Sequence, residues 1–190
     1  MNGKLFFEVV CKIVGVNNAT LYAQKFGDLD DWLNNDLRNY EGLAFYIYTT
    51  EMGWYEVINS ELWSHSPSSH FQLFKSVLNN ALKKMEPYKA NKGIVFRGFR
   101  AKDLESFLHT YRLGEVITFH GFTSASFKQD YAYVGNVLFI IKALTGCGVW
   151  FLSPKYEECE VLIPAGKSFR VEGVERQGAK VVVYLEEIPS

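Results

Sequence analysis

The chain has 190 residues, with 20 Lys and Arg against 21 Asp and Glu, so its formal net charge is −1. This balance does not support broad nucleic-acid binding, which depends on a basic surface. Hydrophobic residues make up 48% of the chain, enough for a sizeable core, and no apolar run approaches the ~18 residues that indicate a membrane-spanning helix. Residues 5–16 are apolar but are interrupted by charges and lack the cleavage site of a signal peptide.

The first half of the chain favours helices. Apolar residues recur at three-to-four spacing over Leu29–Tyr40 and Tyr55–Leu62. The intervening run Leu43–Tyr48 is compatible with a strand or a helix, since its branched and aromatic residues favour a strand while its neighbours continue the helical pattern. The clearest helical stripe covers Phe71–Met85, and Pro87 is expected to end that helix.

From Gly93 onward the sequence changes to short apolar runs separated by Gly, Pro, Asn or charged residues, which is typical of strands. A short helix is expected at Leu104–Leu108. The order of helices first and strands afterwards indicates an α+β fold. We expect one domain over residues 1–190, with residues 1–36 as a peripheral N-terminal extension. The predicted strands are Ile94–Phe99, Val116–Phe119, Val137–Leu144, Val149–Leu152, Glu160–Ile163, Phe169–Val174 and Lys180–Ile188.

The cysteines and histidines favour neither a disulfide framework nor a metal site. Cys11, Cys147 and Cys159 are an odd number without CxxC spacing, so three free thiols in a reducing compartment are expected. The four histidines show no zinc-ligand spacing, and we expect no metal.

Arg97 interrupts the apolar strand Ile94–Phe99. A charge inside such a strand must reach a partner or face a cleft, because burying it alone is costly. A structural ion pair and a ligand contact are equally compatible with this pattern. A guanidinium fork suits a phosphate group, and the following Gly98 would allow a ligand to approach the backbone.

Two further polar pairs lie downstream. Ser124 and Ser126 follow a predicted strand, where paired serines usually serve turn chemistry. Glu158 and Glu160 flank Cys159, and on extended backbone residues two apart project to the same side. Such a pair suits acid/base chemistry or stabilisation of a cation, although it is also common on solvated strand edges. The sequence contains no GxSxG, GxGxxG or Walker pattern.

Taken in chain order, these motifs resemble the Arg–Ser–Glu class of mono-ADP-ribosyltransferases, which includes cholera-toxin-like and ecto-transferase-like enzymes. The matching segments are Phe96–Gly98, Phe122–Ser126 and Glu158–Pro164, and the resemblance extends from about Leu37 to Ile188. The chain departs from the family pattern at Ala125, where a Thr is usual, and in a short segment between Ser126 and Val137.

The resemblance implies a helical N-terminal half packed on a mixed or antiparallel β core of two sheets, with NAD as the substrate and without a metal. Five residues would contact NAD: Arg97, Gly98, Ser124, Ser126 and Glu160. Glu160 would stabilise the cation that forms as nicotinamide leaves, Arg97 would hold the diphosphate, and Ser124 would keep the site ordered. Phe127, Tyr131 or Tyr133 would pack on the nicotinamide.

Glu158 would act on the acceptor, since a Glu at this position accompanies arginine acceptors in the family. The loop Leu152–Glu157, with Tyr156, would read the target protein. The resemblance thus implies a monomeric bacterial toxin or effector that modifies an arginine of a target protein. We expect it to be secreted or injected and to act in the cytoplasm of a target cell, or else to be a cytoplasmic enzyme. An NAD glycohydrolase and an inactive binding module of the same fold are the alternatives.

Overall fold

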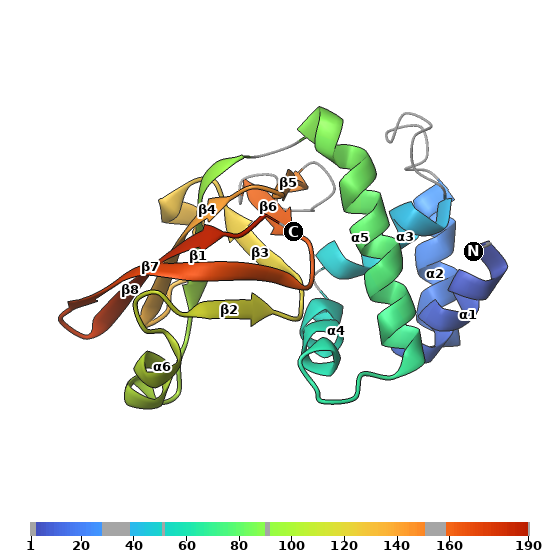
Figure 1. Cartoon of the computed structure of the whole chain (residues 1–190). Helices are drawn as coiled ribbons and strands as arrows, with labels where there is room; N and C mark the ends of the chain where they lie inside the picture. Colours follow the sequence, from blue (N-terminus) through green and yellow to red (C-terminus); the bar gives the residue numbers. More distant parts are fainter. Residues whose placement is uncertain (1–2, 28–38, 51, 90–91, 151–158, 190) are drawn as a thin grey trace. The chain divides into compact units, whose positions relative to one another are not determined.

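The computed structural model describes residues 3–27, 39–50, 52–89, 92–150 and 159–189. The chain divides into two compact units, a helical unit that ends at Tyr88 and a strand-rich unit that begins at Lys89. Figure 1 shows helices α1 to α5 ahead of all the strands in chain order. This succession confirms the α+β class.

The helical unit is built from α1 (Gly3–Val14), α2 (Val16–Gly27), α3 (Asn39–Thr49), α4 (Trp54–Leu62) and α5 (Ser69–Lys89). Gly15 separates the first two helices with a φ of 82°, a conformation that glycine adopts without strain. The ambiguous run Leu43–Tyr48 is helical, within α3. Most of the helix predicted over Leu29–Tyr40 lies outside the described residues.

The long helix α5 confirms the predicted apolar stripe. All seven stripe residues are buried, namely Phe71, Phe74, Val77, Leu78, Ala81, Leu82 and Met85. The expected end at Pro87 is wrong, because the helix continues to Lys89. Pro87 therefore lies in the last turn, where its missing N–H removes one backbone hydrogen bond without ending the helix.

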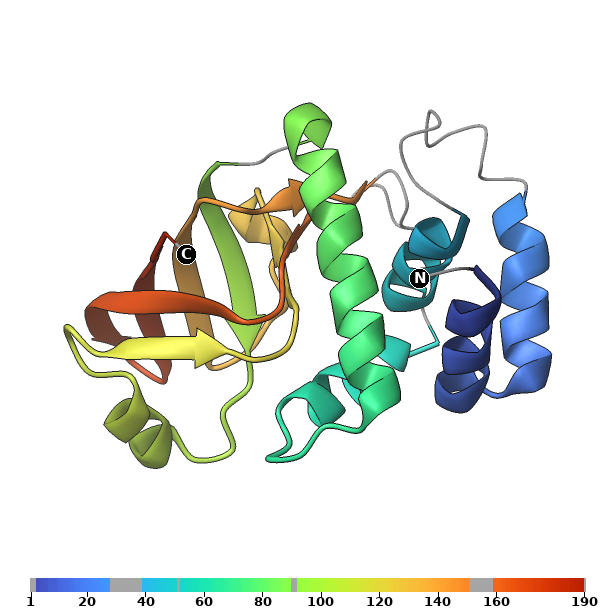
Figure 2. The ribbon, with the colours of Figure 1, turned by 45° about the vertical axis from the view of Figure 1, so that its right-hand side comes forward.

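The strand-rich unit forms one mixed sheet in the order β2-β7-β8-β4-β1-β3-β6-β5. Among the strands that the structure describes, β4 and β8 run parallel and the other neighbouring pairs are antiparallel. Figures 1 and 2 both show β2 beside β7. The strands are β1 (Gly93–Phe99), β2 (Val116–Phe119), β3 (Thr123–Ser126), β4 (Val137–Ala143), β5 (Cys147–Gly148), β6 (Glu160–Ile163), β7 (Lys167–Gln177) and β8 (Lys180–Glu187), with α6 at Leu104–Thr110 and a 3-10 turn at Gln129–Tyr131.

The sheet differs from the expected pair of sheets. The group β2-β7-β8-β4-β1 and the group β3-β6-β5 are joined into one ladder by a single register pair, Phe96 with Ser126. The described strands therefore belong to one connected sheet and not to two. In addition, β5 precedes the strand predicted at Val149–Leu152, and no strand begins at Val149 in the described part of that segment.

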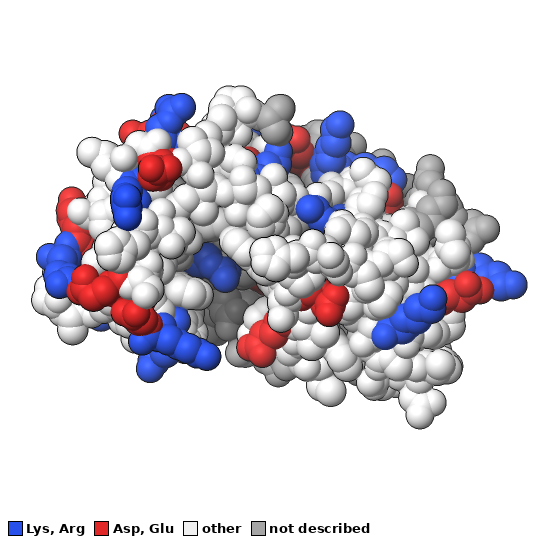
Figure 3. Space-filling model, turned by 60° about the horizontal axis from the view of Figure 1, so that its bottom comes forward, with Lys and Arg blue, Asp and Glu red and all other residues white. Residues whose placement is uncertain are grey.

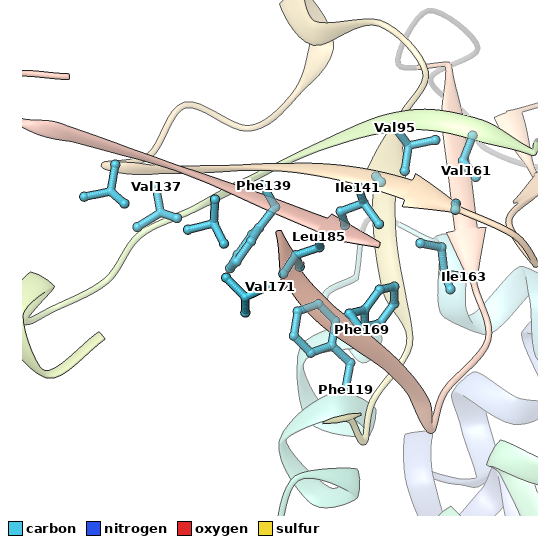
Figure 4. Packing of buried hydrophobic residues seen from close by; sticks show 14 of the residues in the cluster. Val95, Phe119, Val137, Phe139, Ile141, Val161, Ile163, Phe169, Val171 and Leu185 are labelled. Atoms are coloured by element: carbon cyan, nitrogen blue, oxygen red, sulfur yellow. The ribbon is translucent and has the colours of Figure 1, made fainter. Parts of the chain in front are cut away.

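The core of this unit is a cluster of aromatic and branched side chains from most of its strands. Along β4, residues Val137, Phe139 and Ile141 are buried and alternate with more exposed neighbours, as expected for a strand with one face in the core. Phe139 contacts Phe119, and Phe119 contacts Phe169, with ring centroids 6.0 Å and 4.8 Å apart. Figure 4 shows these side chains packed together. They fix the strands that carry the polar motifs.

Candidate active site

Three adjacent strands, β1, β3 and β6, carry three of the four predicted catalytic residues and the predicted NAD-contacting Ser126. Arg97 lies on β1, Ser124 and Ser126 lie on β3, and Glu160 begins β6. These strands are neighbours in the sheet, although in the sequence β2 separates β1 from β3, and β4 and β5 separate β3 from β6. The strand order therefore brings residues from 97 to 160 into one region.

Arg97, Ser124 and Glu160 are connected by two short hydrogen bonds. The Arg97 Nη1 donates to the backbone carbonyl of Ser124 at 2.7 Å. The Ser124 hydroxyl donates to Glu160 Oε1 at 2.6 Å, a length typical of a hydroxyl bound to a charged carboxylate. All three residues are partly exposed, whereas Ala125 and Val161 beside them are buried. The structure thus places a cation, a hydroxyl and a carboxylate together within reach of solvent.

Strand geometry explains why Arg97 uses a backbone group of Ser124. Arg97 is two residues from the core residue Val95 and so lies on the same face of its strand. Ser124 and Glu160 are adjacent to the buried Ala125 and Val161 and so lie on the opposite face from them. Beyond the single β1–β3 pair the ladder stops, so the Ser124 carbonyl is available to a side chain instead of a strand partner. The guanidinium therefore binds the carbonyl, and the hydroxyl is left to bind the carboxylate.

Ser126 is placed differently from Ser124. It stands directly opposite Glu160 in the β3–β6 register and is 4% exposed. Its hydroxyl accepts a hydrogen bond from the backbone N–H of Lys128 at 3.1 Å. Ser126 therefore shapes the turn that leaves β3, beside the site.

Gly98 allows a close approach, and the approaching group belongs to the chain itself. A Cβ at Gly98 would lie 1.5 Å from the carbonyl oxygen of Tyr133. Any residue larger than glycine would displace the segment around Tyr133 from β1. The sequence predicted that this glycine would allow a ligand to approach the backbone. The contact with Tyr133 is a second reason why a larger residue would not fit at position 98.

Tyr111 is a neighbour of the site that sequence reasoning did not find. Its ring packs on Phe107 with centroids 4.2 Å apart and also contacts Phe139. Burial raises the pKa of Tyr111 to about 12, and the positive charge of Arg97 opposes this rise. Tyr111 therefore remains a neutral aromatic group near Arg97 at physiological pH. Its only sequence signal was an aromatic residue three positions after the short helix predicted at Leu104–Leu108.

Glu158 and Tyr156 lie outside the described residues, as does the rest of the loop Leu152–Glu157. Cys159, between the two glutamates, is buried and has a φ of 51°. The extended backbone assumed for the Glu158–Glu160 pair is therefore absent at Cys159. All three cysteines are free thiols.

Three further observations concern the surface charges, the metal-ligand residue types and the helices of the described residues. On the face shown in Figure 3, Lys and Arg side chains are interspersed with Asp and Glu. Among the described residues, no three or more His, Cys, Asp or Glu side chains are grouped so that they could hold a metal ion. None of the described helices combines the length and apolar character needed to span a membrane.

Arg97, Ser124 and Glu160 are thus linked on an eight-stranded mixed sheet, and they come from the three motifs that resemble those of ADP-ribosyltransferases. The chain belongs to the NAD:arginine ADP-ribosyltransferase family, whose family model matches residues 19–190.

Two relatives and one solved structure illustrate the similarity. The chain is 33% identical over 153 residues to Mav of Mycobacterium avium, which is named as an NAD(+)–arginine ADP-ribosyltransferase; the match covers 77% of this chain and 18% of Mav. It is 29% identical over 145 residues to the NAD(+)–protein-arginine ADP-ribosyltransferase Tre1 of Serratia proteamaculans, covering 75% of this chain and 31% of Tre1. The chain thus spans less than a third of either relative.

The structure of the type III effector XopAI from Xanthomonas axonopodis pv. citri shares the fold. Its TM-score is 0.79 at 21% identity, over 98% of this chain and 87% of the XopAI chain.

Proposed function

We propose that this chain is an NAD-dependent mono-ADP-ribosyltransferase that transfers ADP-ribose to an arginine side chain of a target protein and releases nicotinamide. The observation that carries the proposal is the linked Arg97–Ser124–Glu160 arrangement. Its members are the residue types that the family motifs supply, and they meet in the strand-rich unit. Family membership supports the choice of NAD and of arginine.

Arg97 and Ser124 would prepare the donor side. A guanidinium presents its N–H donors in a rigid fork that matches the oxygens of a diphosphate. The 2.7 Å bond to the Ser124 carbonyl restricts the rotamers of Arg97, so less entropy is lost when the diphosphate binds. The Ser124 hydroxyl, through its 2.6 Å bond, holds one oxygen of Glu160 in place. Gly98 and Ser126 would shape the backbone around this pair.

Glu160 would stabilise the positive charge that develops on the ribose as its bond to nicotinamide breaks. A carboxylate positioned in advance lowers the barrier because it does not have to reorganise during the reaction. Glu158 would orient the acceptor guanidinium and take a proton from it as it attacks the ribose carbon, since a protonated guanidinium is a poor nucleophile. Tyr156 would contact the target protein.

We further propose that residues 1–190 act as one catalytic domain, with residues 1–36 peripheral, and that the protein is a bacterial toxin or effector delivered into a target cell. The family model extends across both compact units, which supports a single domain. The similarity to proteins of several bacteria, one of them a type III effector, supports the delivery.

The test is incubation of the purified chain with NAD labelled in its adenylate part and a mixed cell lysate. Labelled protein bands, with ADP-ribose located on arginine by mass spectrometry, are the expected result. Release of nicotinamide with only free ADP-ribose would instead identify a glycohydrolase, and NAD left intact would indicate a binding module. The Glu160→Gln variant is the matched control, because it preserves the shape of the side chain and removes its charge.

A further inference from the structure

The hydroxyl of Tyr111 is a partly buried donor without a protein partner. Among the residues that the structure describes, no group forms a hydrogen bond with this hydroxyl, and only the backbone N–H of Tyr111 is bonded, to the Phe107 carbonyl at 3.2 Å. Burial raises the pKa of Tyr111 to about 12, which shows that the phenol oxygen itself is withdrawn from water. A polar group in this condition costs free energy, so its retention calls for an explanation.

The ring that carries this hydroxyl is held on two sides. It stacks on Phe107, with centroids 4.2 Å apart and an interplanar angle of 21°. It also contacts Phe139, at 5.3 Å, and Phe139 belongs to the core cluster shown in Figure 4. Tyr111 is in addition the C-cap residue of α6. Because the side chain is already ordered, little conformational entropy is lost when the hydroxyl binds a ligand.

Phe139 also places Tyr111 beside Arg97. Arg97 and Phe139 stand opposite each other in the β1–β4 register, so their side chains lie on the same face of the sheet. Tyr111 packs on Phe139 and therefore borders the face from which Arg97 projects. Both Tyr111 and Arg97 are partly exposed, which leaves them accessible to a ligand.

The two side chains offer the same kind of interaction. The positive charge of Arg97 lowers the pKa of Tyr111, but burial outweighs this effect and the phenol keeps its proton. A guanidinium has only donors, and a protonated phenol has one O–H to donate. A group that is rich in acceptor oxygens would therefore satisfy both, and a diphosphate is such a group.

We propose that the Tyr111 hydroxyl donates a hydrogen bond to the diphosphate of NAD, next to the guanidinium of Arg97. The inference rests on the proposed function, in which Arg97 holds the diphosphate. It adds an uncharged donor to the residues that contact NAD. The diphosphate keeps its charge and its covalent bonds while nicotinamide leaves, so this hydrogen bond would be equally strong in the ground state and the transition state. Tyr111 would thus contribute to the binding of NAD and not to the rate of its cleavage.

The first test compares Tyr111→Phe with wild type, because phenylalanine keeps the ring and removes only the hydroxyl. We expect the KM for NAD in nicotinamide release to rise about tenfold, as for loss of a hydrogen bond to a charged group, while kcat changes less than about twofold. The inhibition constant of ADP, which carries the diphosphate, should rise about as much, and that of adenosine should change less than about twofold.

Tyr184→Phe is the matched control. It removes a tyrosine hydroxyl from the same unit, one that forms a hydrogen bond with Glu175. Tyr184 alternates along β8 with the core residues Val183 and Leu185 and so lies on the other face of that strand. Its substitution should leave the KM for NAD and the inhibition by ADP within about twofold of wild type.

The second test measures chemical unfolding at pH 7 and needs no turnover. Without a ligand, the denaturant midpoint of Tyr111→Phe should equal or exceed that of wild type, because the variant lacks an oxygen that has no partner. With ADP at a fixed concentration, the midpoint should rise more in wild type than in the variant. A hydroxyl with a merely structural role would give the opposite pattern, a lower midpoint without ligand and an equal rise with ADP.

The outcomes separate this inference from the function on which it rests. A wild-type protein that binds neither NAD nor ADP would overturn both. The same KM for NAD and the same inhibition by ADP in wild type and Tyr111→Phe would overturn the inference alone. An equal loss of adenosine binding would move the contact to the nucleoside, and a fall in kcat at unchanged KM would place the hydroxyl in the reaction step; either result would refute the contact with the diphosphate.

Discussion

Replacing Ser124 by Ala isolates one bond of the site, because the two bonds at Ser124 use different atoms. The bond from Arg97 goes to the backbone carbonyl and survives the substitution. The 2.6 Å bond from the hydroxyl to Glu160 is lost. A hydrogen bond to a charged group contributes about 1.5–3 kcal/mol. Since about 1.4 kcal/mol corresponds to a tenfold change in rate, we expect kcat/KM for NAD cleavage to fall about 10- to 100-fold.

The assay is nicotinamide release together with transfer to free arginine, and both should fall in parallel because the donor step precedes either outcome. Ser168→Ala is the matched control, since it removes a neutral bond of 2.8 Å between Ser168 and Thr118 elsewhere in the same unit and should keep activity within about twofold. A Ser124→Ala enzyme with near-wild-type kcat/KM would show that the hydroxyl does not organise Glu160, and the assignment of Ser124 to the site would be wrong.

Four other substitutions probe the donor and acceptor carboxylates, the close approach at Gly98 and the ionisation of Tyr111. Glu160→Gln should lower NAD hydrolysis and arginine transfer together by about 10²–10³-fold, whereas Glu158→Gln should keep most hydrolysis and lose transfer; equal loss in both variants, measured in the same two assays, would contradict the separate roles. Gly98→Ala should lower the free energy of unfolding by about 1–3 kcal/mol, because its Cβ would collide with the Tyr133 carbonyl; unchanged denaturant midpoints would refute this contact. Burial raises the pKa of Tyr111 from 10.0 to about 12, so its stabilising contribution is present below pH 10 and is lost as the pH rises toward 12. In the wild type the free energy of unfolding should therefore fall by about 2–3 kcal/mol between pH 10 and pH 12, and Tyr111→Phe should lack this fall. Identical pH profiles of chemical unfolding for both proteins would count against it.

Periodicity predicted the elements that have one buried face and failed where burial is nearly complete. The stripe Phe71–Met85 could be identified because its apolar residues follow the turns of a helix. Most of the run Leu43–Tyr48 is buried, so its apolar residues show no helical period and its branched and aromatic content suggested a strand equally well. The strand Thr123–Ser126 is too short and too polar for alternation to reveal it.

The members of the candidate site could be chosen from the sequence, but their connections could not. Residue type and motif order selected Arg97, Ser124 and Glu160. Periodicity cannot determine that β1, β3 and β6 are neighbours, because strand order depends on long-range packing. Nor does a side-chain motif predict that Arg97 binds a backbone carbonyl. The contact of Tyr111 with Phe139 was equally hidden, since it joins residues separated by 28 positions.

The single register pair between β1 and β3 explains how this site can be rigid and accessible together. On its other edge β1 pairs with β4 at seven positions, from Gly93 with Ala143 to Phe99 with Val137, so its backbone is firmly fixed. Toward β3 the ladder ends after one pair, and the Ser124 carbonyl then accepts a guanidinium. A longer ladder would satisfy that carbonyl from a backbone N–H and leave Arg97 without it. Pairing on one edge thus supplies the rigidity, and the short junction on the other supplies the room in which a guanidinium, a hydroxyl and a carboxylate meet.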